Sequence, residues 1–309
     1  MVEATADLAE EIRRVAAKVE TARAKINLAL HVLSRRTDGY HLIDSLTVFA
    51  DAGDTVEAHP IDEPLARLTV DGPFANDLET TTRPQDNLVL RAADELSREF
   101  GGHQYRGVRL HLTKRLPVAA GIGGGSADAA AALRLLSRYW GIEASAETLA
   151  RVGLRLGADV PMCLVSRPLR AEGIGERIAP QPNMPALPLV LAHPGATLST
   201  AAVFRRLPAG ERTAMLPLPG RFANLIEFVQ WLRLTRNDLA EPAAEEARAV
   251  TVATRVVAGD PECLFARMSG SGATVFGIFN SPAAAERAAA RISAARPGWW
   301  VIATRAPGS

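Results

Sequence analysis

The chain is organised around a glycine-rich stretch, Pro117-Val118-Ala119-Ala120-Gly121-Ile122-Gly123-Gly124-Gly125-Ser126-Ala127-Asp128. Its four glycines let the backbone adopt dihedral angles closed to other residues and approach a ligand without an intervening Cβ. Residues 129–139 are rich in alanine, leucine and arginine, which predicts a helix. Ser126 or Asp128 would be its N-cap. A loop that leads into a helix N-terminus presents unpaired N–H groups and a partial positive charge, and both favour a phosphate.

The spacing of the glycines separates this loop from two better-known phosphate loops. A G-x-x-x-x-G-K-[ST] loop is excluded because no lysine follows the glycines. A G-x-G-x-x-G fingerprint fails because counting from Gly121 places Ser126 at the last position. The pattern that remains is P-x-x-x-G-[IL]-G-G-G-S. A plain turn between packed elements is the alternative, and the closing serine and the alanine-rich helix weigh against it.

Composition is that of an ordinary soluble protein. The 309 residues are enough for two domains, with 48% hydrophobic and 22% charged residues. A net charge of +1 gives no sign of a nucleic-acid or acidic-membrane partner. Two cysteines, Cys163 and Cys263, argue against a disulfide framework or a zinc site. No transmembrane-length apolar run and no signal-peptide core are evident, so a cytoplasmic enzyme is expected.

Lysine is rare in this chain, which makes each lysine informative. Only Lys18, Lys25 and Lys114 occur among 35 basic residues. Residues 22–32 alternate apolar and polar side chains, which predicts a strand with Lys25 and Asn27 on its polar face. A solvated edge strand is the ordinary interpretation of such a face. The functional interpretation is that Lys25 is used for its compact ammonium group, whose pKa the surroundings can shift.

Two further segments carry candidate functional residues. Residues 36–41 form a turn that contains Asp-Gly, and its Tyr40 and His41 either pack the turn or hold a base. Asp159 lies between Gly157, which is expected to end a helix, and Pro161, so its carboxylate is held in a short, stiff segment. A simple turn aspartate is the alternative.

The remaining pattern predicts an α+β protein, because strands and helices occur in clusters and do not alternate regularly. Residues 1–20 read as a charged helical extension, 60–85 as mostly loop, and 167–177 as a connection between domains. The expected strands are 46–58 (broken at Gly53), 65–70, 108–112 and 187–192, with a short apolar strand after a second Gly-Ser loop at 268–276. The expected helices are 87–100 (capped by Asp86), 146–156, 199–206, one opened by 237–239, and 283–294.

Taken together, these segments resemble the GHMP kinases, the superfamily of galactokinase and of homoserine, mevalonate and phosphomevalonate kinases. The resemblance runs from Ala22 to the C-terminus. Besides the loop, the matching pieces are Ala24-Lys25-Ile26-Asn27, Asp38-Gly39-Tyr40-His41, Asp86-Asn87-Leu88, Leu156-Gly157-Ala158-Asp159-Val160-Pro161, Ala192-His193-Pro194-Gly195, Asn237-Asp238-Leu239 and Ser269-Gly270-Ser271-Gly272. Each piece alone is a weak indicator of the family, but the order and spacing of all of them together are specific to it.

The resemblance implies a two-domain fold that binds ATP. Residues 21–166 would form a domain akin to domain 2 of ribosomal protein S5, and residues 167–309 a ferredoxin-like domain. ATP and Mg²⁺ are the implied cofactors, with no protein ligand named for the metal. The implied ATP-binding residues are Asn87, near the adenine, and Pro117, Val118, Ala119, Ala120, Gly121, Ile122, Gly123, Gly124, Gly125, Ser126 and Ala127. Ala119 and Ala120 replace glycines common in the family and Ala127 replaces a serine, so residue 127 would contribute only its backbone.

The motifs point to one branch of the family, which phosphorylates a hydroxyl of a small cytidine diphosphate-linked alcohol in isoprenoid precursor synthesis. The resemblance implies that Tyr40, His41 and Phe204 lie against the cytidine. Lys25, Asn27 and Asp159 would surround the reacting hydroxyl, with Asp159 accepting its proton and Lys25 stabilising the developing negative charge.

Two other interpretations are compatible with the sequence. The first is a GHMP kinase for a different acceptor, such as homoserine or a mevalonate derivative. The second, from another class, is an S5-like nucleotide- or RNA-binding module without turnover, against which the near-neutral charge and the Lys25–Asp159 combination count. Either a monomer or a homodimer is compatible with the sequence.

Overall fold

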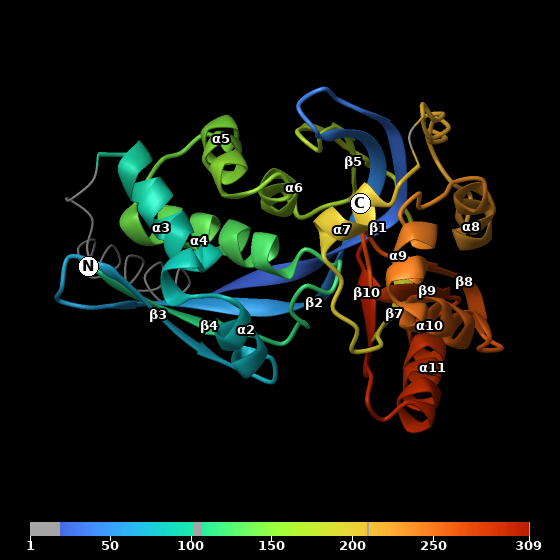
Figure 1. Ribbon diagram of the computed structural model, residues 1–309. Helices are drawn as coiled ribbons and strands as arrows, with labels where there is room; N and C mark the ends of the chain where they lie inside the picture. Colours follow the sequence, from blue (N-terminus) through green and yellow to red (C-terminus); the bar gives the residue numbers. More distant parts are fainter. Residues whose placement is uncertain (1–18, 102–106, 209, 309) are drawn as a thin grey trace, which may run out of the picture. The chain divides into compact units, whose positions relative to one another are not determined.

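The structure, a computed structural model, describes residues 19–101, 107–208 and 210–308 (Figure 1). It divides into two compact units, each discontinuous in sequence. Unit one comprises the described residues up to Ala22 together with Gly53–Leu116 and Gly125–Leu164, and unit two comprises Arg23–Ala52, Pro117–Gly124 and the described part of Val165–Ser309. The expected helical extension over 1–20 lies outside the described residues except for Val19 and Glu20, which instead begin a strand. The division into 1–20, 21–166 and 167–309 stays a prediction.

Unit one is built on strands whose apolar residues face its helices. Strand β4 (Val108–Thr113) pairs in parallel with β3 (Ala66–Asp71) and antiparallel with the end of β2 (His41–Pro60). The register sets Val56 opposite Leu112 and Ala58 opposite Leu110, so buried apolar side chains of neighbouring strands meet. The helices of the unit are α2 (Ala75–Thr81), α3 (Leu88–Glu99), α4 (Gly124–Trp140), α5 (Ala146–Leu156) and α6 (Val160–Val165), of which α3 contacts both β3 and α5 (Figure 1).

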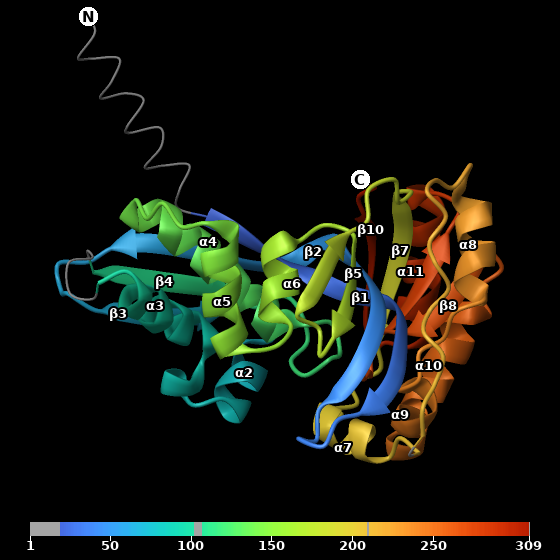
Figure 2. The ribbon, with the colours of Figure 1, turned by 90° about the horizontal axis from the view of Figure 1, so that it is seen from above.

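Unit two contains a ferredoxin-like sheet. The strands β7 (Leu187–His193), β8 (Cys263–Met268), β9 (Val275–Phe279) and β10 (Trp300–Ala306) lie in the order β10-β7-β9-β8, all antiparallel. Helix α10 (Arg248–Ala258) packs on β8 and β9, and α11 (Pro282–Ala295) packs on β7 and β10 (Figure 2). With β7 first, a helical segment next, then β8, β9, α11 and β10, this is a βαββαβ arrangement. The expected ferredoxin-like topology is confirmed.

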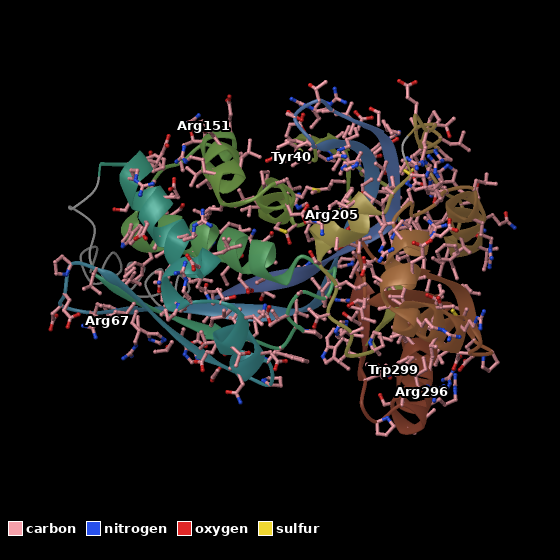
Figure 3. All side chains as sticks on the ribbon, viewed as in Figure 1. Tyr40, Arg67, Arg151, Arg205, Arg296 and Trp299 are labelled. Carbon is pink, nitrogen blue, oxygen red and sulfur yellow. The ribbon has the colours of Figure 1, made fainter. Side chains whose placement is uncertain are left out.

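The remainder of unit two includes strands that do not belong to this sheet. Strand β1 (Val19–Arg35) pairs with β2, and the start of β2 pairs with β5 (Leu169–Gly173), which pairs with β6 (Arg177–Pro180). The helices α7 (Thr200–Arg205), α8 (Leu225–Arg233) and α9 (Ala240–Glu246) complete the unit. After α11, the Arg296 guanidinium lies 5.7 Å from the Trp299 ring centroid in a cation–π contact (Figure 3).

Several local expectations were wrong. Strand β2 runs unbroken through Gly53, and the supposed loop over 60–85 contains the helix α2. Residues 167–177 contain β5 and the first residue of β6, and their expected role as a connection between domains stays a prediction. Asp86 does not cap α3. It ends a short 3₁₀ turn (Pro84–Asp86), and Asn87 is the N-cap.

Two absences concern the described residues only. No helix in the described part of the chain combines the length and apolarity needed to cross a bilayer. Both cysteines are free thiols.

Candidate active site

The glycine-rich loop turns sharply because alternate residues adopt left-handed backbone angles. Ala119, Gly121 and Gly123 have φ of +53°, +74° and +64°. This region is open to glycine but unfavourable for residues with a Cβ, so Ala119 is held in a strained conformation. The expectation that glycines are needed here is confirmed at Gly121 and Gly123.

The same loop is anchored through its carbonyl groups. Three consecutive carbonyls accept hydrogen bonds from other residues of unit two: Ala120 O from Thr274 N (3.1 Å), Gly121 O from Ser269 Oγ (3.2 Å) and Ile122 O from Lys25 N (2.9 Å). A planar trans peptide points its N–H away from its own C=O. The N–H groups of residues 121–123 therefore point away from these anchors, as a phosphate cradle requires.

Close packing explains why no side chain fits at two of these positions. A Cβ on Gly121 would lie 2.4 Å from the carbonyl oxygen of Gly272, in the second Gly-Ser loop. A Cβ on Gly123 would lie 3.0 Å from Cε of Lys25. The two Gly-Ser loops thus contact each other backbone to backbone, and the stem of Lys25 lies directly against the first loop.

Lys25 and Asn27 are placed by β1, but not on a solvent-exposed face. Their exposed fractions are 5% and 4%, because both faces of β1 are covered between residues 24 and 32. The Asn27 side chain donates from Nδ2 to Ser45 Oγ (2.8 Å) and Thr47 Oγ1 (3.2 Å), and its backbone N–H donates to Ser269 Oγ (3.1 Å). These contacts hold the Asn27 amide in one orientation.

The sequence did not single out the residues that support Asn27. Ser45 and Thr47 are two residues apart on β2 and so lie on the same face of the strand. A serine and a threonine in a strand are common, so their residue types do not indicate a functional role. Ser269 and Asn237 occur in the quoted motifs, but without a role. In the structure, Asn237 Nδ2 donates to the carbonyls of Met268 and Gly270, 2.9 Å from each, and so fixes the second loop.

Two of the three expected cytidine-binding residues come together in unit two. The His41 and Phe204 rings lie 4.9 Å apart between centroids, tilted by 31°. Burial lowers the pKa of His41, and the charges of Arg35 and Arg212 lower it further, so the imidazole is favoured in its neutral form. Tyr40, by contrast, is 58% exposed at the β1–β2 turn (Figure 3).

Two expected ATP-binding features belong to unit one: Asn87 and most of the helix that follows the loop. Asn87 is 7% exposed, and its Oδ1 accepts from Val89 N (2.9 Å) at the start of α3. Helix α4 begins at Gly124, so Ser126 and Asp128 lie inside it and neither is its N-cap. The cap prediction failed because propensity favours starting a helix after the glycines, whereas here packing extends it into them.

Asp159 directly precedes α6, and its carbonyl accepts from Cys163 N (3.1 Å). Pro161 therefore lies in the first turn of a short helix, where proline is tolerated. The expected short, stiff segment is the junction between α5, whose C-cap is Gly157, and α6. Lys25 belongs to unit two and Asp159 to unit one, so their pairing stays a prediction. Across the described ranges, no three His, Cys, Asp or Glu side chains are grouped as a metal site.

Comparison with known proteins connects this geometry to a family. The family model of the GHMP kinases N terminal domain matches residues 87–167, and that of the GHMP kinases C terminal matches residues 223–297. A 4-diphosphocytidyl-2-C-methyl-D-erythritol kinase of Chelativorans sp. (strain BNC1) is 49% identical over 284 residues, which cover 92% of this chain and 94% of the relative. The corresponding protein of Rhizobium etli (strain CIAT 652) is 48% identical over 285 residues, covering 92% and 93%.

The chain belongs to the 4-diphosphocytidyl-2-C-methyl-D-erythritol kinase family, within the GHMP kinases. A crystal structure of 4-(cytidine 5'-diphospho)-2C-methyl-D-erythritol kinase matches with a TM-score of 0.75 and 31% identity, covering 94% of this chain and all of that one. The L. major mevalonate kinase in complex with R-mevalonate shares the fold alone, with a TM-score of 0.65 at 12% identity, covering 94% of this chain and 96% of that one. This chain is therefore an α+β, two-domain GHMP kinase that uses ATP to phosphorylate a small molecule. The interpretation as a binding module without turnover was wrong.

Proposed function

We propose that this chain transfers the γ-phosphoryl group of ATP to the 2-hydroxyl of 4-diphosphocytidyl-2-C-methyl-D-erythritol, in the non-mevalonate route to isoprenoid precursors. The anchored loop supports the assignment of ATP. The carbonyls of residues 120–122 accept hydrogen bonds on one side of the loop, and the N–H groups of residues 121–123 point to the other side. The acceptor is supported by the names of relatives that match over more than nine-tenths of the chain.

For the nucleotide, the loop N–H groups and the first turn of α4 would bind phosphate oxygens, since both present unpaired donors and a partial positive charge. Asn87 would lie near the adenine. Mg²⁺ commonly binds through substrate phosphates, water and one or two carboxylates, and needs no protein cage. The described residues fit an ion that arrives with ATP, and this ion would neutralise phosphate charge during transfer.

For the acceptor, the reacting hydroxyl would lie near Lys25, Asn27 and Asp159. Asp159 would accept the proton of the hydroxyl as the oxygen attacks phosphorus. The Lys25 ammonium would stabilise negative charge on the transferred group, and its stem, packed against Gly123, ties this charge to the loop. Asn27, held by Ser45 and Thr47, would orient the hydroxyl.

The cytidine end would be recognised by the aromatic residues of unit two. The His41–Phe204 ring pair offers aromatic faces and a polar imidazole edge, which suit a pyrimidine. Tyr40 would close over the base from its exposed position. Protein stacking on a base is typically worth about 1–3 kcal/mol.

An ADP-release assay with a panel of acceptors tests the proposal. The purified chain, with ATP and Mg²⁺, should release ADP with 4-diphosphocytidyl-2-C-methyl-D-erythritol and not with homoserine or mevalonate. Mass spectrometry should find the product heavier by one phosphoryl group. Faster turnover of homoserine or mevalonate would contradict the assigned acceptor. Omission of Mg²⁺ with added chelator should abolish release. A cytoplasmic location and the oligomeric state stay predictions.

A further inference from the structure

Three charged side chains in unit one are buried beside the nucleotide loop and have no role in the scheme above. Asp54 comes from β2, Lys114 follows β4, and Asp128 lies in α4; their exposed fractions are 0%, 2% and 3%. Lys114 Nζ donates to Asp54 Oδ2 (2.5 Å) and to Asp128 Oδ2 (2.8 Å). The ammonium therefore joins two carboxylates from different elements.

The chain positions of these residues enclose the loop. Lys114 stands three residues before Pro117, and Asp128 comes directly after Ala127, so their ion pair connects the two ends of the loop. The other oxygen of Asp54, Oδ1, accepts the N–H groups of Arg115 (2.5 Å) and Leu116 (2.8 Å), the two residues that lead into the loop.

The backbone of Lys114 is fixed as well. Its N–H donates to Asp71 O (2.7 Å), and its carbonyl accepts from Phe74 N (3.2 Å). Gly72 packs so closely that a Cβ there would lie 2.5 Å from the Lys114 carbonyl oxygen. The Lys114 backbone is thus attached to the end of β3 and to the residues that follow it.

The electrostatics of the cluster argue for a geometric role. Burial raises the pKa of Asp128 to about 7 despite the attraction of Lys114, and the like charge of Asp54 adds to the rise. Burial would lower the pKa of Lys114, but the charges of Asp128 and Asp54 outweigh it and raise this pKa. Asp128 Oδ1 is buried without a hydrogen-bond partner in the described structure. Buried ion clusters of this kind add little net stability compared with apolar packing.

We infer that Lys114, Asp54 and Asp128 form a clamp that closes the base of the nucleotide loop and so sets its affinity for ATP. The clamp residues are positioning residues, which act through the backbone of residues 115–127. The inference rests on the proposed ATP loop and extends it to residues that do not touch the nucleotide.

Two isosteric variants, Asp54→Asn and Asp128→Asn, test the clamp because each replaces a carboxyl group by an amide with little change in shape. Asp54 uses both oxygens as acceptors, and an amide nitrogen cannot accept, so Asp54→Asn must break one of its contacts. Asp128 accepts through one oxygen only, so Asp128→Asn can retain the contact to Lys114.

Binding of a non-hydrolysable ATP analogue by calorimetry, and KM for each substrate, are measured on the full chain. Asp54→Asn should weaken analogue binding at least about tenfold, while Asp128→Asn should weaken it at most about threefold. The KM for the cytidyl substrate should stay within about twofold in both. Leu136→Ala, which removes buried packing from the same helix, should lower the melting temperature without weakening analogue binding.

Equal effects of the two asparagine variants, or equal losses for both substrates in Asp54→Asn, would overturn the clamp. If Asp54→Asn does not fold, Asp128→Ala tests the clamp in its place. Alanine has no oxygen to accept the hydrogen bond from Lys114, whereas the asparagine of Asp128→Asn keeps one. Analogue binding by Asp128→Ala should be about tenfold weaker than by Asp128→Asn, and equality overturns the clamp. If the parent itself does not bind the analogue, the proposed ATP loop fails instead. The two failures are therefore distinguishable.

Discussion

Two of the three lysines in this chain, Lys25 and Lys114, are buried at 5% and 2% exposure. In a chain that otherwise uses arginine, a buried lysine indicates a place where a compact ammonium is needed. The sequence identified Lys25 through its motif, but it could not identify Lys114, because the partner carboxylates are 60 and 14 positions away. Contacts of that separation are set by tertiary packing.

Exchange of Lys25 for arginine tests whether its compact ammonium is needed. The planar guanidinium is longer, and Cε of Lys25 already lies close to the Gly123 backbone, so Lys25→Arg should lose most of kcat although the charge is kept. Arg23→Lys, the reverse exchange two residues away on β1, is the control and should keep the parental kcat. A Lys25→Arg enzyme with parental kcat would make Lys25 a purely structural residue.

Asp159→Asn tests the proposed base. The amide retains the shape but cannot take a proton, so kcat should fall by roughly 10²–10⁴ while the KM of the cytidyl substrate changes little. If Asp159 and Lys25 act as a pair, the variant with both changes should be little slower than the slower single variant. Fully multiplicative losses in kcat would contradict the pairing.

Phe204→Ala tests recognition of the cytosine. Loss of the ring in contact with His41 should raise KM for the cytidyl substrate by an amount equivalent to about 1–3 kcal/mol, with KM for ATP nearly unchanged. Tyr40→Ala should have the smaller effect, because Tyr40 is largely exposed. An equal rise in both KM values after Phe204→Ala would indicate general damage to unit two.

His193 gives a pH dependence of stability. Burial lowers its pKa from 6.5 to about 4, so between these values the unfolded chain binds a proton that the folded chain does not. This difference stabilises the folded chain by at most about 3 kcal/mol. The stabilisation is fully present above about pH 6.5 and is lost as the pH falls towards 4. The free energy of unfolding, measured with denaturant, should therefore decrease less between pH 6.5 and pH 4 for His193→Gln than for the parent. His59→Gln, at a more exposed histidine, is the control. Parallel curves for parent and His193→Gln would contradict this assignment.

At the scale of elements, the most constrained feature is the contact between the two Gly-Ser loops. Gly121→Ala combines an unfavourable positive φ with a Cβ 2.4 Å from the Gly272 carbonyl oxygen. Gly141→Ala has a similar φ of +67°, but no atom lies within 4 Å of its Cβ. The Gly141 variant should lose about 1 kcal/mol of unfolding free energy from backbone strain alone. The Gly121 variant should lose more, and should also bind ATP more weakly in calorimetry. If Gly121→Ala and Gly141→Ala lose the same unfolding free energy, the two Gly-Ser loops are not in close contact.

The sequence predicted most elements whose hydrophobic periodicity is strong. Helix α5 and strands β3 and β7 lie within a residue of their expected bounds, because their patterns coincide with their packing. Helix α2 was missed, because it buries no residue and therefore leaves no apolar pattern. The early start of α4 was missed for the opposite reason, since glycine is a poor helix former and tertiary contacts decide the outcome there.

At the scale of the molecule, the motifs predicted the fold class because their order along the chain is specific. What they could not predict is that each compact unit is assembled from separate stretches of chain. The core of unit two includes Leu30 and Val32 of β1, buried with Val190, Met268 and Phe279 of the ferredoxin-like sheet. Sequence periodicity has a short range and cannot place residues 30 and 190 in one core.

This shared core leads to a prediction about the boundary at 166/167. A fragment of residues 167–309 would lack β1, so the apolar surface that covers Leu30 and Val32 would face water, and Asp238 would lose the Val32 N–H that it accepts at 2.7 Å. We expect the fragment to show no cooperative thermal transition by circular dichroism, while the intact chain does. A fragment that joins residues 19–52 to 165–309 through a flexible linker restores β1 and should recover a cooperative transition. Cooperative melting of the 167–309 fragment at the temperature of the intact chain would show instead that the ferredoxin-like region folds without β1.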